Sequence, residues 1–191
     1  RLRPQVEAVL AALFQRKAPH AMLFPTDETP ADDPITLPYH LSSHILLWRV
    51  LTRPHAIGLK ENYLHLADEL RQAIDQYFVV RHQSGKMLYS YATDGQGHIH
   101  FYHDANDLPL VLAPVWQFVA LDNPTWRATV EFAFSEANRG GIYGGRLGSV
   151  HTQAPWSLGD IQDLIIARVI GDTQRETCAW QHLHNAAQAD G

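Results

Sequence analysis

The chain has 191 residues, which suits about one domain, and its 46% hydrophobic and 18% charged residues place it among globular proteins. Its net charge of −5 argues against nucleic-acid binding, and no apolar run approaches the ~18 residues that cross a membrane. The single cysteine, Cys178, excludes an internal disulfide framework and a cysteine zinc site.

The first part of the chain is predicted to be mainly helical. A first helix is expected on an apolar stripe formed by Val6, Val9, Leu10, Leu13 and Phe14. Residues 17–38 follow as a long irregular segment rich in proline and acidic residues, partly anchored by the apolar residues 22–24. Apolar periodicity then predicts a second helix over residues 40–53 and a third over residues 59–80.

The apolar period next changes from 3.6 to 2. Residues 86–92 and 98–103 are short segments rich in Tyr, Ile and Phe, and the glycine-containing turn 94–97 between them predicts a β-hairpin. A helix from Leu108 to Leu121 follows. Asn123-Pro124 is a cap and first-turn signal for another helix.

The last third combines a glycine-rich loop over residues 140–148 with two helices. Ser157 and Asp160 resemble a capping box, and Gly171-Asp172 ends that helix and caps the last one. The core face expected for the helix after Ser157 consists of Ile161, Leu164, Ile165 and Val169. About seven helices in adjacent pairs, with one small hairpin, predict an all-α fold of antiparallel helical hairpins.

A dense polar cluster lies between the hairpin and the following helix. It comprises His98, His100, Tyr102, His103, Asp104, Asn106 and Asp107. One interpretation is that Asn106 or Asp107 simply caps the helix that begins at Leu108. The other is catalytic, because partial desolvation of Asp104 beside aromatic rings would suit a general acid.

A second cluster occupies the glycine-rich loop and the residues after it. Tyr143, Arg146, His151 and Trp156 are groups that hold sugars, since aromatic faces cover pyranose C–H surfaces and polar side chains bind the hydroxyls. The alternative is a connecting loop that a buried Trp156 anchors.

A metal site is a third possibility for the histidines. His98 and His100 share one face of the predicted strand, and with His103 or Asp104 they could hold a metal ion. His40 and His44 lack the glutamate of a HExxH motif, and the glycine-rich loop lacks the Gly-Lys-Ser/Thr of a phosphate-binding loop.

The two clusters together resemble the six-hairpin glycosidases, most closely the metal-independent exo-α-mannosidases, with the glucoamylase-like enzymes more distant. The residues 103–109, His-Asp-Ala-Asn-Asp-Leu-Pro, resemble the D-A-N motif of that clan and precede an apolar helix with Trp116. After one further helix come Gly-Ser-Val-His-Thr over residues 148–152 and Pro155-Trp156. The matching motifs lie within residues 85–171.

The resemblance implies a fold, a mechanism and a set of site residues. The fold would be part of an (α/α)6 toroid, and the enzyme would invert the anomeric centre with one general acid and one general base. Asp104 matches the acid, and the resemblance implies neither a metal nor another cofactor. The implied sugar subsite comprises His103, Asn106, Asp107, Trp116, Tyr143, Arg146, His151 and Trp156.

The same resemblance sets expectations for the chain as a whole. Residues 1–191 would be a single domain, part of a larger barrel whose catalytic base lies on a loop beyond Gly191. The expected partner is an oligosaccharide or glycan substrate, with no nucleic acid and no membrane. Uncovered apolar helix faces predict self-association or contact with the remainder of the barrel. A cytoplasmic location is expected rather than secretion, because the sequence shows no signal peptide.

Two alternatives to a hydrolase stay open at this point. One is a non-catalytic carbohydrate-binding or scaffold helical domain, and the other is a metal-dependent sugar enzyme that uses His98 and His100.

Overall fold

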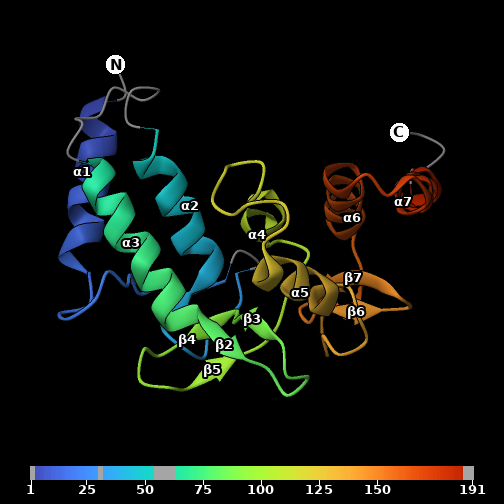
Figure 1. The fold of residues 1–191 in the computed structure, drawn as a ribbon, viewed down its shortest axis with the longest axis horizontal. Coiled ribbons are helices and arrows are strands. Elements are labelled where there is room, and N and C mark those ends of the chain that lie inside the picture. The colour runs from blue at the N-terminus through green and yellow to red at the C-terminus, as the bar shows by residue number, and fades with distance from the viewer. Residues whose placement is uncertain (1–2, 30–31, 54–62, 187–191) are drawn as a thin grey trace.

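The structure, a computed structural model, describes residues 3–29, 32–53 and 63–186. In these residues it contains seven helices and eight short strands, and the strands form three small antiparallel sheets (Figure 1). The prediction of an all-α fold with one hairpin is therefore wrong. Strands of two to four residues are too short to leave a recognisable alternating pattern, and β1 pairs with β4, which lies far away in the sequence.

Helices α1 to α3 lie side by side at one end of the molecule, α6 and α7 lie at the other, and α4 and α5 lie between them (Figure 1). The helices are α1 (Arg3–Gln15), α2 (Leu41–Leu51), α3 (Tyr63–Phe78), α4 (Leu108–Leu112), α5 (Pro124–Ala133), α6 (Ser157–Ile170) and α7 (Thr173–Ala186). None of the helices in the described ranges is long and apolar enough to cross a membrane.

The helices predicted before and after the proline-rich segment are confirmed by α1, α2 and α3. The predicted start of the third helix, residues 59–62, lies outside the described residues. Its predicted end is wrong, because residues 79–80 begin a strand. Both are valines, whose branched side chains favour extended backbone.

Two sheets lie next to α3, and they correct the predicted hairpin. Their strands are β1 (Tyr39–His40), β2 (Val79–Arg81), β3 (Met87–Tyr89), β4 (Ala92–Thr93) and β5 (Ile99–His100). β2 pairs with β3, and β4 lies between β1 and β5. Only β4 pairs across the turn at residues 94–97, because the first half of the predicted hairpin turns back to the end of α3.

The middle of the chain deviates from its predicted helix. α4 ends at Leu112 rather than Leu121, since Pro114 lacks the N–H that a continuing helix needs. The prediction for α5 is confirmed: Asn123 Oδ1 accepts the backbone N–H of Trp126 at 2.9 Å, and Pro124 is the first helical residue.

The glycine-rich segment is a small sheet rather than a loop. Its strands are β6 (Ile142–Tyr143), β7 (Arg146–Ser149) and β8 (Ala154–Pro155). Gly144 and Gly145 have φ of +57° and +75°, the left-handed pair that a two-residue hairpin turn requires. This signal, Tyr-Gly-Gly-Arg, was present in the sequence.

The helix after this sheet differs from the prediction in its N-terminal cap and in which of its residues are buried. Trp156 is the N-cap of α6 and makes no side-chain cap, so the predicted capping box of Ser157 and Asp160 is wrong. Ile161 is 38% exposed, whereas Gln162 is fully buried. The stop is confirmed: Gly171 has φ of +77°, and Asp172 Oδ1 accepts the N–H of Arg175 at 2.9 Å.

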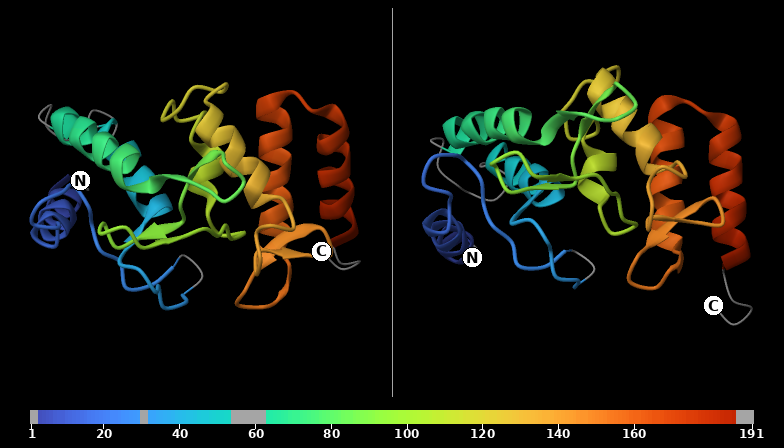
Figure 2. Two further views of the ribbon diagram at one scale, coloured as in Figure 1. Left: turned by 60° about the horizontal axis from the view of Figure 1, so that its bottom comes forward. Right: turned by 90° about the horizontal axis from the view of Figure 1, so that it is seen from below.

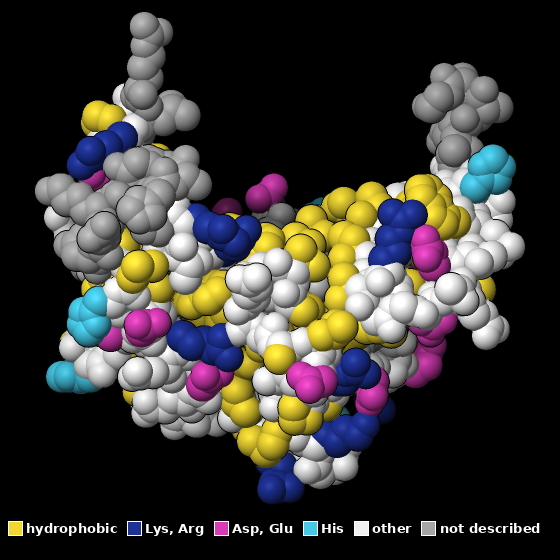
Figure 3. Space-filling model, turned by 45° about the horizontal axis from the view of Figure 1, so that its top comes forward, with side chains coloured by type: hydrophobic (Ala, Val, Ile, Leu, Met, Phe, Trp, Pro, Cys, Tyr) yellow, Lys and Arg dark blue, Asp and Glu magenta, His cyan; other side chains and the backbone are white. Residues whose placement is uncertain are grey.

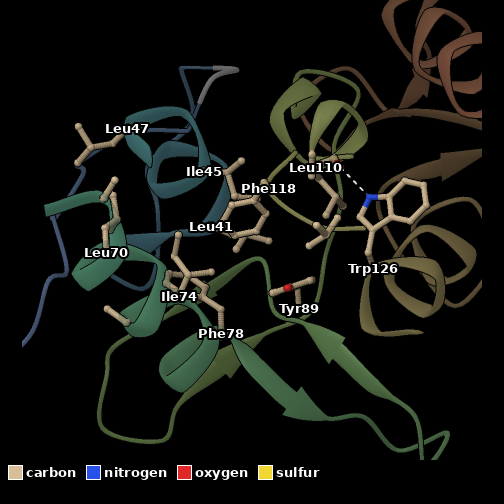
Figure 4. Packing of buried hydrophobic residues seen from close by; sticks show 14 of the residues in the cluster. Leu41, Ile45, Leu47, Leu70, Ile74, Phe78, Tyr89, Leu110, Phe118 and Trp126 are labelled. Carbon is tan, nitrogen blue, oxygen red and sulfur yellow. Dashed lines mark hydrogen bonds between the residues drawn. The ribbon is translucent and has the colours of Figure 1, made fainter. Parts of the chain in front are cut away.

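The hydrophobic core joins α2 and α3 to the loop after α4 and to α5 (Figure 4). Ile45, Leu70, Ile74 and Phe78 are fully buried within it. Trp126 Nε1 donates to Leu110 O at 2.9 Å, so α5 is tied to α4 by a hydrogen bond as well as by packing. On the face opposite the sheets near α3, hydrophobic side chains lie exposed between basic ones (Figure 3). The expected self-association or contact with further chain stays a prediction.

The irregular segment 17–38 is anchored on this core. Met22, Leu23 and Phe24 are at most 8% exposed. The buried ring of His44 in α2 accepts the backbone N–H of Phe24 at Nε2 (3.0 Å), and its Nδ1 donates to His40 O at 2.6 Å. Both ring nitrogens are satisfied only while His44 is neutral, and burial lowers the pKa of His44 to about 4.

This arrangement predicts an acid-sensitive anchor. In the unfolded chain His44 binds a proton below pH about 6.5, whereas in the folded chain it does so only below about 4. The contribution of His44 is therefore complete above pH 6.5 and lost as the pH falls to 4, on the order of 3 kcal/mol. Urea unfolding at a series of pH values should show the free energy of unfolding of the wild type falling between pH 6.5 and 4. In His44→Gln the free energy of unfolding should fall less over the same range. Equal slopes in both proteins would contradict the assignment.

Candidate functional site

Asp104 lies in the irregular stretch between β5 and α4, and its side chain is held by three donors. Tyr102 Oη donates to Asp104 Oδ2 at 2.7 Å. The backbone N–H and the side-chain amide of Asn106 donate to Asp104 Oδ1 at 2.9 and 3.0 Å. Asp104 is 4% exposed, so these bonds fix the carboxyl group in a largely desolvated position.

Two fully buried amide side chains hold the backbone around Asp104. Asn138 accepts the N–H of His103 at 3.0 Å and donates to His103 O at 2.9 Å. Gln162, from α6, donates to Asp104 O at 3.1 Å and to Ala105 O at 2.6 Å. Sequence reasoning missed both residues, because neither belongs to a local motif and their partners lie 35 to 59 positions away.

His103 belongs to this frame and not to a sugar-binding surface. Its ring is buried, and Nε2 donates to Gln162 Oε1 at 2.8 Å. Burial lowers the pKa of His103, against the opposing effects of Asp107, Gln162 and Asp104, which favours the neutral ring. His103 therefore helps to hold the D-A-N segment in place through its bond to Gln162 and does not line the cavity.

Asp107 stands at the N-cap position of α4, but its side chain makes no cap hydrogen bond. The simple capping interpretation is therefore wrong for Asp107. Its Oδ1 lies 3.1 Å from His40 Nε2, and both side chains are at most 1% exposed. Within the described ranges, neither carboxylate oxygen of Asp107 has a hydrogen-bond partner.

A cavity of about 180 Å³ opens beside Asp104. Its wall includes His100 and Tyr102, whose rings are stacked at 5.8 Å and 5°, and Tyr91, which meets Tyr102 edge-on at 5.1 Å. The other wall includes residues 33–36 of the proline-rich segment, and Val150 also contributes. Pockets for drug-sized ligands span roughly 300–1,000 Å³, so this cavity suits one small ring. Three larger cavities, two between α1 and α2 and one between α5 and α6, are not lined by Asp104.

The rim of the cavity joins two loops that are distant in the sequence. His151 Nδ1 lies 2.9 Å from Asp33 Oδ1, and Val150 N–H donates to Tyr102 Oη at 3.1 Å. Figure 2 shows the loop after β7 and the proline-rich segment on the same side of the molecule. The hydrogen bond to Asp33 raises the pKa of His151, which favours its charged form at the rim.

The other candidate residues are engaged elsewhere and do not line the cavity. Arg146 forms a bidentate pair with the buried Asp160, in which Nε donates to Oδ1 at 2.9 Å. Tyr143 Oη donates to Gly140 O at 2.9 Å. Two tryptophans are also occupied: Trp156 Nε1 donates to Thr152 Oγ1, and Trp116 packs on the core beside Arg49.

Within the described ranges no group of three His, Cys, Asp or Glu side chains could hold a metal ion. His98 pairs with Asp94, with Nδ1 2.6 Å from Oδ2. His100 stacks on Tyr102. The proposed ligand set of His98, His100 and Asp104 is therefore not assembled, and the metal-dependent alternative gains no support.

A family model and a curated protein match this chain in sequence. A family model described as metal-independent alpha-mannosidase (GH125) matches residues 16–178. The meiotically up-regulated gene 157 protein of Schizosaccharomyces pombe is 28% identical over 113 residues, which are 56% of this chain and 22% of that protein.

A solved structure from Streptococcus pneumoniae shares the fold. It is described as one of the metal-independent alpha mannosidases, in a non-productive complex with alpha-1,6-mannobiose. It superposes with a TM-score of 0.73 at 23% identity, over 87% of this chain and 42% of that chain. The chain thus spans less than half of the solved structure and about a fifth of the yeast relative.

Proposed function

The chain belongs to the metal-independent alpha-mannosidase family (GH125), and on that premise we propose that it carries the general acid of a glycoside hydrolase that cleaves α-linked mannosides. The membership confirms the resemblance drawn from the D-A-N motif. The observation that supports the proposal is the buried Asp104 carboxyl, fixed by three donors, in the wall of a cavity for one ring.

In the proposed reaction the terminal mannose occupies the cavity beside Asp104. The aromatic faces of Tyr91 and Tyr102 suit the C–H surface of the ring, and Asp33 and His151 at the rim offer charged partners for hydroxyl groups. Asp104 protonates the glycosidic oxygen while its bond to the anomeric carbon breaks. A second carboxylate activates water on the opposite face, ~6.5–9.5 Å from the acid. We assign that base to no described residue.

Proton NMR of the first product tests the proposal. The protein as its gene encodes it is incubated with α-1,6-mannobiose, with and without a chelator. Initial release of β-mannose, unaffected by the chelator, is the expected result. Initial release of α-mannose would contradict inversion, and loss of activity with the chelator would favour the metal-dependent alternative. Saturable binding of the disaccharide without hydrolysis would favour the non-catalytic carbohydrate-binding alternative.

A further inference from the structure

The hydroxyl of Tyr102 lies at the centre of the site and has four polar neighbours, one of which is the Ser149 side chain. It donates to Asp104 Oδ2 at 2.7 Å, it can donate instead to Gly140 O at 3.4 Å, and it accepts the N–H of Val150 at 3.1 Å. The ring is fixed between His100 and Tyr91, so the oxygen stays in place while its proton can rotate.

A count of donors and acceptors shows what this arrangement permits. A phenol has one proton and two acceptor lone pairs. The N–H of Val150 occupies one lone pair, and the other can accept either the Ser149 hydroxyl or a protonated Asp104. Burial raises the pKa of Tyr102, and the hydrogen bond to Asp104 acts in the same direction, so the hydroxyl keeps its proton at neutral pH. That proton can point to the Asp104 carboxylate or to the Gly140 carbonyl, but not to both.

Each of the two orientations of the Tyr102 proton fits one protonation state of Asp104. Because Asp104 Oδ1 already accepts both donors of Asn106, the proton of a protonated Asp104 belongs on Oδ2. Oδ2 can then donate to the second lone pair of Tyr102 Oη in place of the Ser149 hydroxyl, while the Tyr102 proton turns to Gly140 O. When Oδ2 loses its proton, the Tyr102 proton turns back and satisfies the new negative charge.

We propose that Tyr102 is a positioning residue for Asp104, whose hydroxyl changes acceptor from Gly140 O to Asp104 Oδ2 as the acid gives up its proton. The inference rests on the proposed function, because only an acid that cycles between both states needs such a partner. The Asp104 proton goes to the glycosidic oxygen, which keeps the electron pair of the broken C–O bond. Tyr102 neither gains nor loses a proton.

The test compares two substrates in the full-chain Tyr102→Phe variant. α-1,6-Mannobiose has a leaving group that needs a proton, whereas 2,4-dinitrophenyl α-mannoside has one that departs without it. We expect kcat for the disaccharide to fall about tenfold, the effect of one charge-assisted hydrogen bond, with KM changed by less than about twofold. The kcat for the dinitrophenyl substrate should stay within about threefold of the wild type. The alkaline limb of the pH profile should move to higher pH, because the carboxylate has lost a donor.

The matched control is Tyr77→Phe. Tyr77 is a partly buried tyrosine of α3, and its hydroxyl has no recorded hydrogen bond to the described part of the chain. This variant should leave both substrates and the pH profile unchanged. Equal losses on both substrates for Tyr102→Phe, or an unmoved alkaline limb, would overturn the inference.

Two further outcomes must be told apart from a failure of the inference: a variant that does not fold, and a wild type that is inactive. If thermal unfolding shows that Tyr102→Phe does not fold, 3-fluorotyrosine at position 102 keeps the ring and makes a stronger donor. The alkaline limb should then move to lower pH, and an unchanged limb would overturn the inference. A wild-type chain that releases mannose from neither substrate would instead contradict the proposed function itself.

Discussion

Replacing Asp104 with asparagine is expected to lower kcat for α-1,6-mannobiose by about 10²–10⁴-fold, the usual contribution of a general acid. The amide cannot deliver a proton to the leaving oxygen. It can keep the local structure, since its oxygen still accepts the donors of Asn106 and its NH₂ can donate to Tyr102 Oη. The loss should therefore appear in kcat, with KM and the melting temperature close to those of the wild type.

Asp75→Asn is the matched control for this measurement. Asp75 lies on the exposed side of α3, where it pairs with Arg71 at 3.1 Å, and exposed pairs of this kind contribute little to stability. The control should retain wild-type kcat. If Asp104→Asn also retained it, Asp104 would not be the acid, and the site would have to be assigned anew.

Replacing Gln162 with leucine is expected to have the largest effect on stability. Leucine would leave His103 Nε2 and the carbonyls of Asp104 and Ala105 without their partner in a fully buried place. Each buried unsatisfied group costs ~1–3 kcal/mol, so the loss of three partners is expected to lower the free energy of unfolding by at least about 3 kcal/mol. Urea unfolding measures this loss, and kcat should fall with it because the D-A-N segment is no longer held.

Gln174→Leu supplies the comparison, because Gln174 is an exposed residue in the first turn of α7. This substitution should change the free energy of unfolding by less than about 0.5 kcal/mol. If Gln162→Leu were as stable as Gln174→Leu, the buried amide frame would not be what positions Asp104.

The elements that could be predicted from the sequence are those with local signals. Asn123-Pro124 starts α5 and Gly171-Asp172 separates α6 from α7, since each places the required cap or left-handed residue at the boundary. The predicted hairpin is confirmed where β4 pairs with β5, but β1 was missed because its partner β4 lies far away in the sequence. β3 joins the end of α3 instead of the next strand. Only the turn at Gly144-Gly145 carried a local signal that had been available.

In the site, too, the sequence indicated features with a local motif and not those that depend on tertiary contacts. The motif pointed to residues that the fold brings together: Asp104 and Val150 line one cavity, and Asn106 donates to Asp104. Residue type alone could not show that Arg146 is bound to Asp160, or that Trp116 belongs to the core. The supporting residues Asn138 and Gln162 act on His103, Asp104 and Ala105, which only the folded chain brings near.

A crystal structure of the Asp104→Asn variant with α-1,6-mannobiose would show whether Asp104 is placed to act as the acid. We expect one mannose ring in the cavity beside Tyr91 and Tyr102, with the glycosidic oxygen within about 2.6–3.2 Å of the side chain at position 104. A disaccharide bound in the cavity between α5 and α6, or with its glycosidic oxygen beyond the reach of one water from position 104, would contradict this expectation.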